Sequence, residues 1–363
     1  MIRKLFYFLN ACLLLLLFAA CLSCYVSPAV AWVLPFLGLA FPVVIILVFI
    51  FLLIWAVWRK KMFWVNLAVL ILCWPFIRTI VAFHFSHQEE KGIRFMTYNV
   101  RNFDLYNWSG NKKTRARIMN LIGKENPDVI CFQEYYTDDD DFRNTEYLRD
   151  SLGYKFHYLH VTYDKWFKNT SQMKWHHLRW GLAVFSRYEI KDTGVVRFDE
   201  PGGNQCIFAD LDVNGKTLRV YNTHLQSMHL GYDDYDTIEE LSENQNTQWY
   251  KVRNILRKMK HAYTKRAEQA RAVHEHVSAY QGQKIVCGDF NDSPVSYSYQ
   301  TIGSGLQDAF ILRGGGFGKS FDTKLGLFRI DFILPDPSIQ VNSYKTIRKS
   351  LSDHYPVLVT LSL

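Results

Sequence analysis

The chain has 363 residues, enough for more than one domain, and its charge is unevenly distributed. All 34 acidic residues and 36 of the 42 basic residues follow Phe85, so the net charge of +8 falls to +2 over that part. Because the region after Phe85 is nearly neutral, the positive net charge of the chain is no evidence that it binds nucleic acid. The seven cysteines form no Cys-x-x-Cys pair, which argues against a zinc site and against a disulfide framework.

Three apolar stretches open the chain. Residues 5–26 are long enough to cross a bilayer as a helix, 29–58 are long enough to cross with tilt, and a third stretch fades between Arg78 and Phe85. We therefore expect a membrane anchor over residues 1–85, with about three transmembrane helices, and a second domain over residues 86–363. A cleaved signal peptide is the alternative interpretation of the first stretch.

Basic residues predict how these helices are oriented. Arg3 and Lys4 precede the first helix, and Arg59, Lys60 and Lys61 follow the second, which places both groups on the cytoplasmic side. A third crossing then delivers the domain of residues 86–363 to the outer, periplasmic side of a bacterial inner membrane. If the third stretch only lies in the membrane interface, the side is reversed.

Short runs with a period of two alternate with helical stretches after the anchor. Helices are expected at Thr114–Glu125 and Asn246–Tyr280, and Asn214-Gly215 has the composition of a hairpin turn. Many strands and few helices favour an α/β fold of largely antiparallel sheets packed face to face. Strands are expected at Ile93–Val100, Val129–Glu134, Leu182–Ser186, Cys206–Val213, Leu218–Thr223, Lys284–Cys287, Ile330–Leu334 and Val357–Leu361.

Two segments have the composition of insertions. Tyr136–Arg143 carries the acidic run Asp138–Asp141, which is expected to be a solvated loop. Thr162–Trp180 is rich in aromatic and basic residues and is also expected to be a loop. Its composition fits a substrate or headgroup contact, packing on the sheet edge, or contact with the bilayer surface, and these alternatives stay open.

Polar residues end or interrupt several apolar strands. Phosphoester chemistry needs a metal held by hard oxygen ligands, a base for water and donors for the developing charge. The sequence offers such groups at six places in chain order: Asn99, Gln133-Glu134, Asn222 with His224, Asp289 with Asn291, Asp331, and Ser352-Asp353-His354. Asp331 stands out, because a carboxylate flanked by Ile330 and Phe332 is costly to bury without a partner.

This ordered set resembles the endonuclease/exonuclease/phosphatase superfamily, through Thr97-Tyr-Asn99-Val, Gln133-Glu134, Asn222-Thr-His224-Leu, Gly288-Asp289-Phe-Asn291, Arg329-Ile-Asp331 and Ser352-Asp353-His354. The resemblance implies a four-layered α/β sandwich of two mostly antiparallel sheets flanked by helices, here preceded by transmembrane helices. It also implies a hydrolase of phosphoester bonds, of the deoxyribonuclease-like, Mg²⁺-dependent kind, with Mn²⁺ as the alternative metal.

The resemblance also assigns roles to individual residues. Glu134, Asn99 and Asp353 would hold the metal. His354, oriented by Asp331, would be the general base, with Asp289 as a rival for that role. The groups expected to contact the substrate phosphate or the leaving oxygen are Asn99, Asn291, His224 and Asn222.

The physiological substrate is left open. A nuclease, a phospholipid or sphingomyelin phosphodiesterase and an inositol-phosphate phosphatase all fit, so the expected partner is a lipid headgroup, a nucleic acid or a small phosphodiester. The bilayer is the second expected partner, through the N-terminal helices, and no protein partner is inferred. A membrane-tethered binding protein that keeps the fold without turnover is the alternative function.

Overall fold

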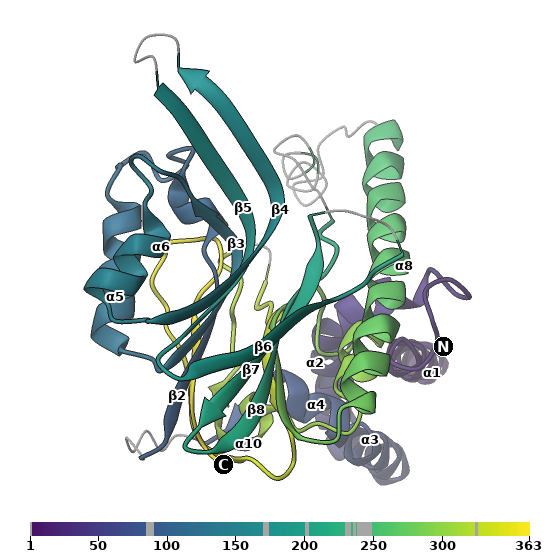
Figure 1. Ribbon diagram of the computed structural model, residues 1–363. Helices are drawn as coiled ribbons and strands as arrows, with labels where there is room; N and C mark the ends of the chain where they lie inside the picture. Colours follow the sequence, from purple (N-terminus) through teal and green to yellow (C-terminus); the bar gives the residue numbers. More distant parts are fainter. Residues whose placement is uncertain are drawn as a thin grey trace. The chain divides into compact units, whose positions relative to one another are not determined.

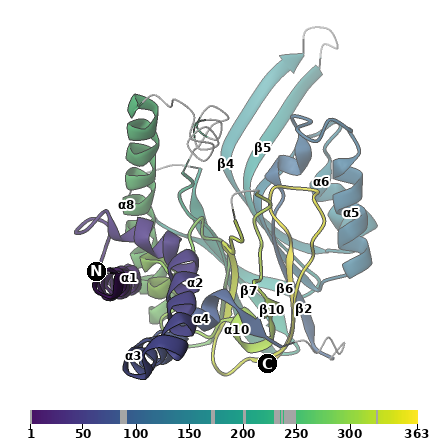
Figure 2. The same cartoon turned by 180° about the vertical axis from the view of Figure 1, so that it is seen from behind.

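The computed structural model describes residues 2–84, 91–169, 174–199, 203–228, 234, 237, 249–323 and 326–363. These residues form two compact units (Figures 1 and 2). The first, here the helix unit, comprises Met1–Arg78, Gln226–Arg271 and Asn291–Thr301. The second, here the sheet unit, comprises Thr79–Leu225, Ala272–Phe290 and Ile302–Leu363. The boundary expected between residues 85 and 86 lies outside the described residues.

Two helices at the start of the chain are long and apolar enough to span a membrane, α1 (Ile2–Leu22) and α2 (Leu34–Trp58). Helices α3 (Lys60–Leu72) and α4 (Trp74–Ile80) meet at a bend of 64°. The described residues therefore contain two candidate spans, or three if the bent pair is counted as one span.

Helices α1 and α2 form an antiparallel hairpin. The ring of Phe6, near the start of α1, lies 5.2 Å from the ring of Trp58 at the end of α2. Between them, the indole N–H of Trp55 donates to the buried side-chain oxygen of Asn10 at 3.0 Å, which satisfies a polar group that would be costly to leave unpaired in an apolar layer. The basic residues that flank the two helices therefore lie at one end of the hairpin.

The other end of the hairpin contacts later parts of the helix unit. The ring of Phe36 lies 5.4 Å from that of Tyr263 on α8 (Trp249–Ala279). The hydroxyl of Ser23 donates to the backbone oxygen of Val295 at 3.1 Å, just before α9 (Tyr297–Ile302). The helix expected at residues 246–280 is confirmed from Trp249 to Ala279; residues 246–248 lie outside the described part.

The sheet unit is built on two large sheets. The six-stranded sheet has the order β12-β13-β2-β3-β5-β4 and the five-stranded sheet the order β11-β9-β8-β7-β6. Within the described strands of these sheets, β2 pairs β3 and β8 pairs β9 in parallel, and the other neighbours are antiparallel. The expected sandwich of two mostly antiparallel sheets is thereby confirmed.

The strands run over β1 (Ala82–Phe83), β2 (Ile93–Asn99), β3 (Val129–Thr137), β4 (Phe156–Asn169), β5 (Lys174–Ser186), β6 (Glu189–Val196), β7 (Gln205–Val213), β8 (Lys216–His224), β9 (Gln283–Asp289), β10 (Gly315–Gly316), β11 (Asp331–Pro335), β12 (Gln340–Thr346) and β13 (Val357–Ser362). The remaining short elements are η1 (Arg101–Asp104), α5 (Thr114–Glu125), α6 (Asn144–Glu146), η2 (Tyr147–Ser151) and α10 (Ala309–Arg313).

Strand β2 is buried on both faces, and each face packs against a different layer of the fold. Its side chains alternate between faces, so Phe95 enters the core between the two sheets, while Met96 and Tyr98 enter a second core shared with α5. Fully burying each such side chain contributes roughly 1.5–3 kcal/mol. Figure 1 shows α5 and α6 on the outer side of the six-stranded sheet.

Three strands of the two large sheets were not predicted from the sequence. Strands β4 and β6 are only partly buried, so polar and apolar residues do not alternate in them, and β12 carries few apolar residues. The expectation that Thr162–Trp180 is a loop was wrong, because its described residues continue β4 and β5 as a paired hairpin. Figure 1 shows this hairpin extending past its neighbouring strands.

One glycine lets the parallel strands β8 and β9 approach each other next to the predicted site. Gly288 has φ +126°, and a Cβ built on it would lie 1.9 Å from the backbone oxygen of Thr223. We expect Gly288→Ala to destabilise the protein by roughly 2–4 kcal/mol, since both the backbone conformation and the close contact oppose a side chain.

Thermal unfolding of the detergent-solubilised full chain measures this effect. Gly203→Ala is the matched control, because a Cβ at Gly203 meets nothing within 4 Å. Equal melting temperatures for the two variants would contradict the assignment of a steric role to Gly288.

Candidate active site

Side chains from both sheets meet at the ends of the parallel strands. Asn99 ends β2 and Asp289 ends β9, and each is 1 % exposed. The Asn99 side-chain nitrogen donates to Asp289 Oδ2 at 3.0 Å and to Glu134 Oε1 at 3.1 Å. One amide group therefore fixes two carboxylates that belong to different sheets.

Glu134 reaches this position through a bulge in β3. The pairing of β3 with β5 shifts register between Phe132 and Tyr135, and Glu134 has φ +49°. A left-handed conformation is unfavourable for a residue with a side chain, and such strain is typical of functional sites. The carboxylate is left 37 % exposed, so it is open to a ligand.

A second line of buried groups starts at β11. Asp331 is the register partner of Asp289 across the β11–β9 pair. Its Oδ2 lies 2.9 Å from Nδ1 of His354, whose Nε2 in turn lies 3.6 Å from Asp289 Oδ2. Asp331 and Asp289 are each 1 % exposed and His354 is 4 % exposed, so this is a dry carboxylate–imidazole–carboxylate line.

The electrostatics of this line favour a proton on the Asp331–His354 pair. Burial lowers the pKa of His354, but the adjacent charges of Asp331 and Asp289 outweigh burial and raise it well above the ordinary value. Burial also raises the pKa of Asp331, although the nearby imidazole lowers it in part. Both shifts favour a proton bound within the Asp331–His354 pair.

His224, at the end of β8, faces the same carboxylates. Its Nε2 lies 3.7 Å from Asp289 Oδ2 and 3.9 Å from Glu134 Oε1. This nitrogen is buried and has no hydrogen-bond partner among the described residues. A buried polar atom without a partner is unusual and suits a site that receives a polar ligand.

Asp353 lies at the more open side of the cluster. The Ser352 hydroxyl is 2.9 Å from the backbone oxygen of Asn99 and 3.1 Å from Asp353 Oδ1. The Asp353 carboxylate is 32 % exposed and lies 3.4 Å from Nε of Arg101. It borders a cavity of about 220 Å³ that Arg101 also lines.

Two further predicted residues make contacts of another kind. Asn222 is fully buried: its nitrogen donates to the backbone oxygens of Phe132 and Ala183, and its oxygen accepts from Gln133 at 2.6 Å. These bonds join β8 to strands of the other sheet and use both ends of the amide. Asn291 belongs to the helix unit, where its backbone oxygen accepts a hydrogen bond from Arg266.

Sequence reasoning missed Arg101, which follows Asn99 by two residues. Its guanidinium contacts Asp353 and lies 4.2 Å from the centre of the Trp108 ring. A basic residue two positions after Asn99, which is predicted to contact the substrate phosphate, could have indicated that Arg101 belongs to the site. Arg101 to Asp104 all have positive φ, a turn that the residue types do not indicate.

The donor set suits a hard divalent cation. Asp289, Asp331 and His354 offer ligand atoms within 4.8 Å of one another. The close pairing of His354 with Asp331 occupies that end, however, whereas the carboxylates of Glu134 and Asp353 are partly exposed. The His224 nitrogen, which has no hydrogen-bond partner among the described residues, lies 3.9 Å from Glu134 Oε1. The open, oxygen-rich end is therefore the better place for a cation that keeps several waters.

Together, the two stacked sheets and the polar cluster at their strand ends define a class of phosphoester hydrolases. Residues 96–354 match the model of the endonuclease/exonuclease/phosphatase family, and the chain belongs to this family. Residues 3–80 match the model of a domain of unknown function. A search of curated proteins found no match.

Solved structures agree on the fold. Endonuclease/exonuclease/phosphatase proteins from Beutenbergia cavernae and Bacteroides vulgatus are 19% and 20% identical to this chain. Each aligns with a TM-score of 0.50 over 76% of this chain, and over 72% and 100% of its own length, respectively. A humanized D. rerio TDP2 is 15% identical and aligns with a TM-score of 0.50 over 75% of this chain and 99% of its own.

The Asp331–His354 contact predicts a measurable titration. In the metal-free protein, His354 should stay protonated above the pH at which an ordinary imidazole loses its proton. Asp331→Asn should lower the His354 pKa, because it removes the carboxylate charge that stabilises the imidazolium. Histidine-selective NMR of the metal-free chain measures this pKa, and an unchanged value would refute the electrostatic coupling.

Proposed function

We propose that this chain is a Mg²⁺-dependent hydrolase of phosphoester bonds, with phosphodiesters as substrates, in which the Asp331–His354 pair activates the attacking water. The observation that supports this proposal best is that a buried carboxylate–imidazole line and a partly exposed carboxylate lie together at one edge of the sandwich. The buried line from Asp331 through His354 to Asp289 ends beside the Asn99–Glu134 pair, so a proton acceptor and an open carboxylate share one site.

Glu134 and Asp353, with Asn99 beside them, are the residues that we assign to the metal, and Mn²⁺ is the alternative to Mg²⁺. When bound there, the cation would neutralise charge on the phosphoester in the transition state. Glu134 is oriented for this role by the Asn99 amide, and Asp353 by its contact with Arg101.

The remaining groups handle the proton and the phosphate. Asp331 holds Nδ1 of His354, and Nε2 would take the proton of water once it has released its own. A cation bound beside the pair would favour that release. Asp289 is the rival base, but its Oδ2 already accepts the Asn99 N–H, which makes it a weaker acceptor. We assign phosphate contacts to His224 and Asn99, and to Asn291 from the family resemblance alone. Asn222 we assign to sheet pairing.

Activity of the full chain in detergent tests the proposal. We expect Mg²⁺-dependent hydrolysis of bis-p-nitrophenyl phosphate that EDTA abolishes. Glu134→Gln should lower kcat by roughly 10²–10³-fold through loss of charge stabilisation, and His354→Ala by roughly 10²–10⁴-fold through loss of the base.

Two surface substitutions serve as matched controls. Glu275→Gln and His261→Gln change the same residue types at exposed positions of α8 and should leave kcat unchanged. Folded wild type that binds Mg²⁺ but hydrolyses neither this reporter nor DNA, sphingomyelin or inositol phosphates would instead favour a binding protein.

We also propose that the chain is a multi-pass protein of the inner membrane with its catalytic part on the periplasmic side. Arg3 and Lys4 lie at the same end of the α1–α2 hairpin as Arg59 to Lys61, which supports a cytoplasmic location for that end. Tyr263 and Val295 contact the opposite end, so the chain has to cross the membrane again between α2 and α8. The bent α3–α4 pair offers that crossing.

Thiol labelling of intact cells checks this orientation. In a cysteine-free background, Val30→Cys lies in the α1–α2 loop at a position that is 82 % exposed, and should react with an impermeant maleimide. Lys60→Cys, at the other end of the hairpin, should react only after permeabilisation. The reverse labelling pattern would place the catalytic part in the cytoplasm.

A further inference from the structure

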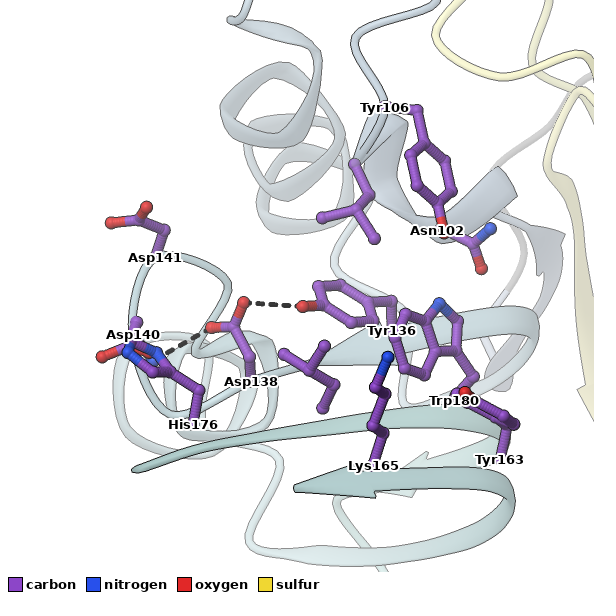
Figure 3. Close-up of a pocket in the computed structure, with 12 residues that line it drawn as sticks. Asn102, Tyr106, Tyr136, Asp138, Asp140, Asp141, Tyr163, Lys165, His176 and Trp180 are labelled. Atoms are coloured by element: carbon purple, nitrogen blue, oxygen red, sulfur yellow. Dashed lines mark hydrogen bonds and ion pairs between the residues drawn. The ribbon is translucent and has the colours of Figure 1, made fainter. Parts of the chain in front are cut away.

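A cavity of about 1030 Å³ is lined by residues that lie close in sequence to the proposed metal ligands, and Figure 3 shows its lining. Tyr136, which lines it, is two residues beyond Glu134 on β3, and Asn102 immediately follows Arg101. All lining residues belong to the sheet unit. Its size is typical of a small-molecule site, and its position suits the part of a substrate attached to the phosphate.

One face of the β4–β5 hairpin forms a wall of this cavity. Strand β3 stops pairing with β5 at the Thr137–Arg179 pair, and among the described strands only β4 pairs with β5 from there toward Lys174. The lining residues alternate along the hairpin, as one face of a strand requires: Tyr163, Lys165, His176, Leu178 and Trp180. Trp166 and His177 lie between them in sequence and stack on each other at 3.9 Å, away from the lining.

The aromatic rings of the wall are held in place. Trp180 lies 4.8 Å from the Tyr136 ring and 5.2 Å from the Tyr163 ring. Tyr136 is only 2 % exposed, and its hydroxyl donates to Asp138 at 2.8 Å. Tyr106, across the cavity in Figure 3, adds a fourth ring. The wall is therefore preformed, which lowers the entropy cost of binding a flat ligand.

Polar groups surround the rings. Three carboxylates, those of Asp138, Asp140 and Asp141, lie together at one end of the cavity in Figure 3. The side chain of Asp138 also accepts the backbone N–H groups of Asp140 and Phe142, which fixes this acidic turn. The ammonium of Lys165 and the amide of Asn102 add donors. Carboxylates outnumber ammonium groups in the lining.

We infer that this cavity binds an uncharged, hydroxyl-rich ring, a sugar or a cyclitol, as the alcohol part of the phosphoester. Such a ring presents an apolar face to aromatic side chains and hydroxyls to both acceptors and donors, so it uses every kind of group in the lining. A nucleic acid strand brings further phosphates toward three carboxylates. A choline group suits aromatic rings and carboxylates but has no partner for Lys165 or Asn102.

This inference rests on the proposed hydrolytic function, and a set of glycerol phosphodiesters tests it. Glycerophosphoinositol and glycerophosphocholine share the glycerol phosphate and differ only in the second alcohol, and thymidylyl-thymidine represents nucleic acid. With the full chain in detergent and Mg²⁺, kcat/KM for glycerophosphoinositol should exceed both others by roughly tenfold, the scale of one aromatic contact.

Two exposed aromatic residues of the hairpin give a matched pair of variants. Tyr163 is 54 % exposed and lines the cavity, and Trp166 is 58 % exposed and does not, so neither substitution empties a core. Tyr163→Ala should raise KM for glycerophosphoinositol roughly tenfold without lowering kcat. Trp166→Ala should leave both constants unchanged.

The results of these assays distinguish a failure of the hydroxylated-ring assignment from a failure of the proposed hydrolytic function. Two outcomes overturn the hydroxylated-ring assignment alone, provided that the protein hydrolyses bis-p-nitrophenyl phosphate. The first is a preference for the choline diester or the dinucleotide, and the second is no turnover of any of the three diesters. The same KM for Tyr163→Ala and wild type also overturns it. Loss of all turnover, the reporter included, would count against the hydrolase itself.

Discussion

The two hydrogen bonds donated by the Asn99 amide hold the candidate active site together. Each carboxylate that accepts one belongs to a different sheet, so the contact fixes the distance between the sheets at their functional edge. Asp289 is almost completely buried, and burying a carboxylate is costly without such a hydrogen-bond donor. The placement of His224 and His354 follows, since both imidazoles face Asp289.

Many residues of the candidate site could be predicted, because polar residues that end apolar runs can be recognised in a sequence. Asn99, His224 and Asp289 all end strands, and parallel neighbours bring such ends together. The family follows from the order of these motifs. Asn222 shows the limit: it is two residues from His224 and so shares a face of β8 with it, but only the packed structure shows that its amide is used between the sheets.

Two other features could not be predicted, for physical reasons. The bulge at Glu134 depends on how β3 meets β5, which is a pairing of distant segments and leaves no local signal. Beyond Thr137, most of the described side chains of the β4–β5 hairpin are exposed or half-buried, so they show no apolar alternation and their composition is typical of a loop. Both features lie next to the open side of the site, where the structure departs from regular packing.

The left-handed backbone of Glu134 has a consequence for how this sequence can drift over time. A side chain at positive φ costs roughly 1–3 kcal/mol, so glycine at this position would give a more stable protein. Selection for stability alone would therefore replace the glutamate. Its retention in a descendant of this chain would report selection on the metal-binding role that we propose for Glu134, whereas glycine or asparagine there would mark a lineage that has kept the fold without that role.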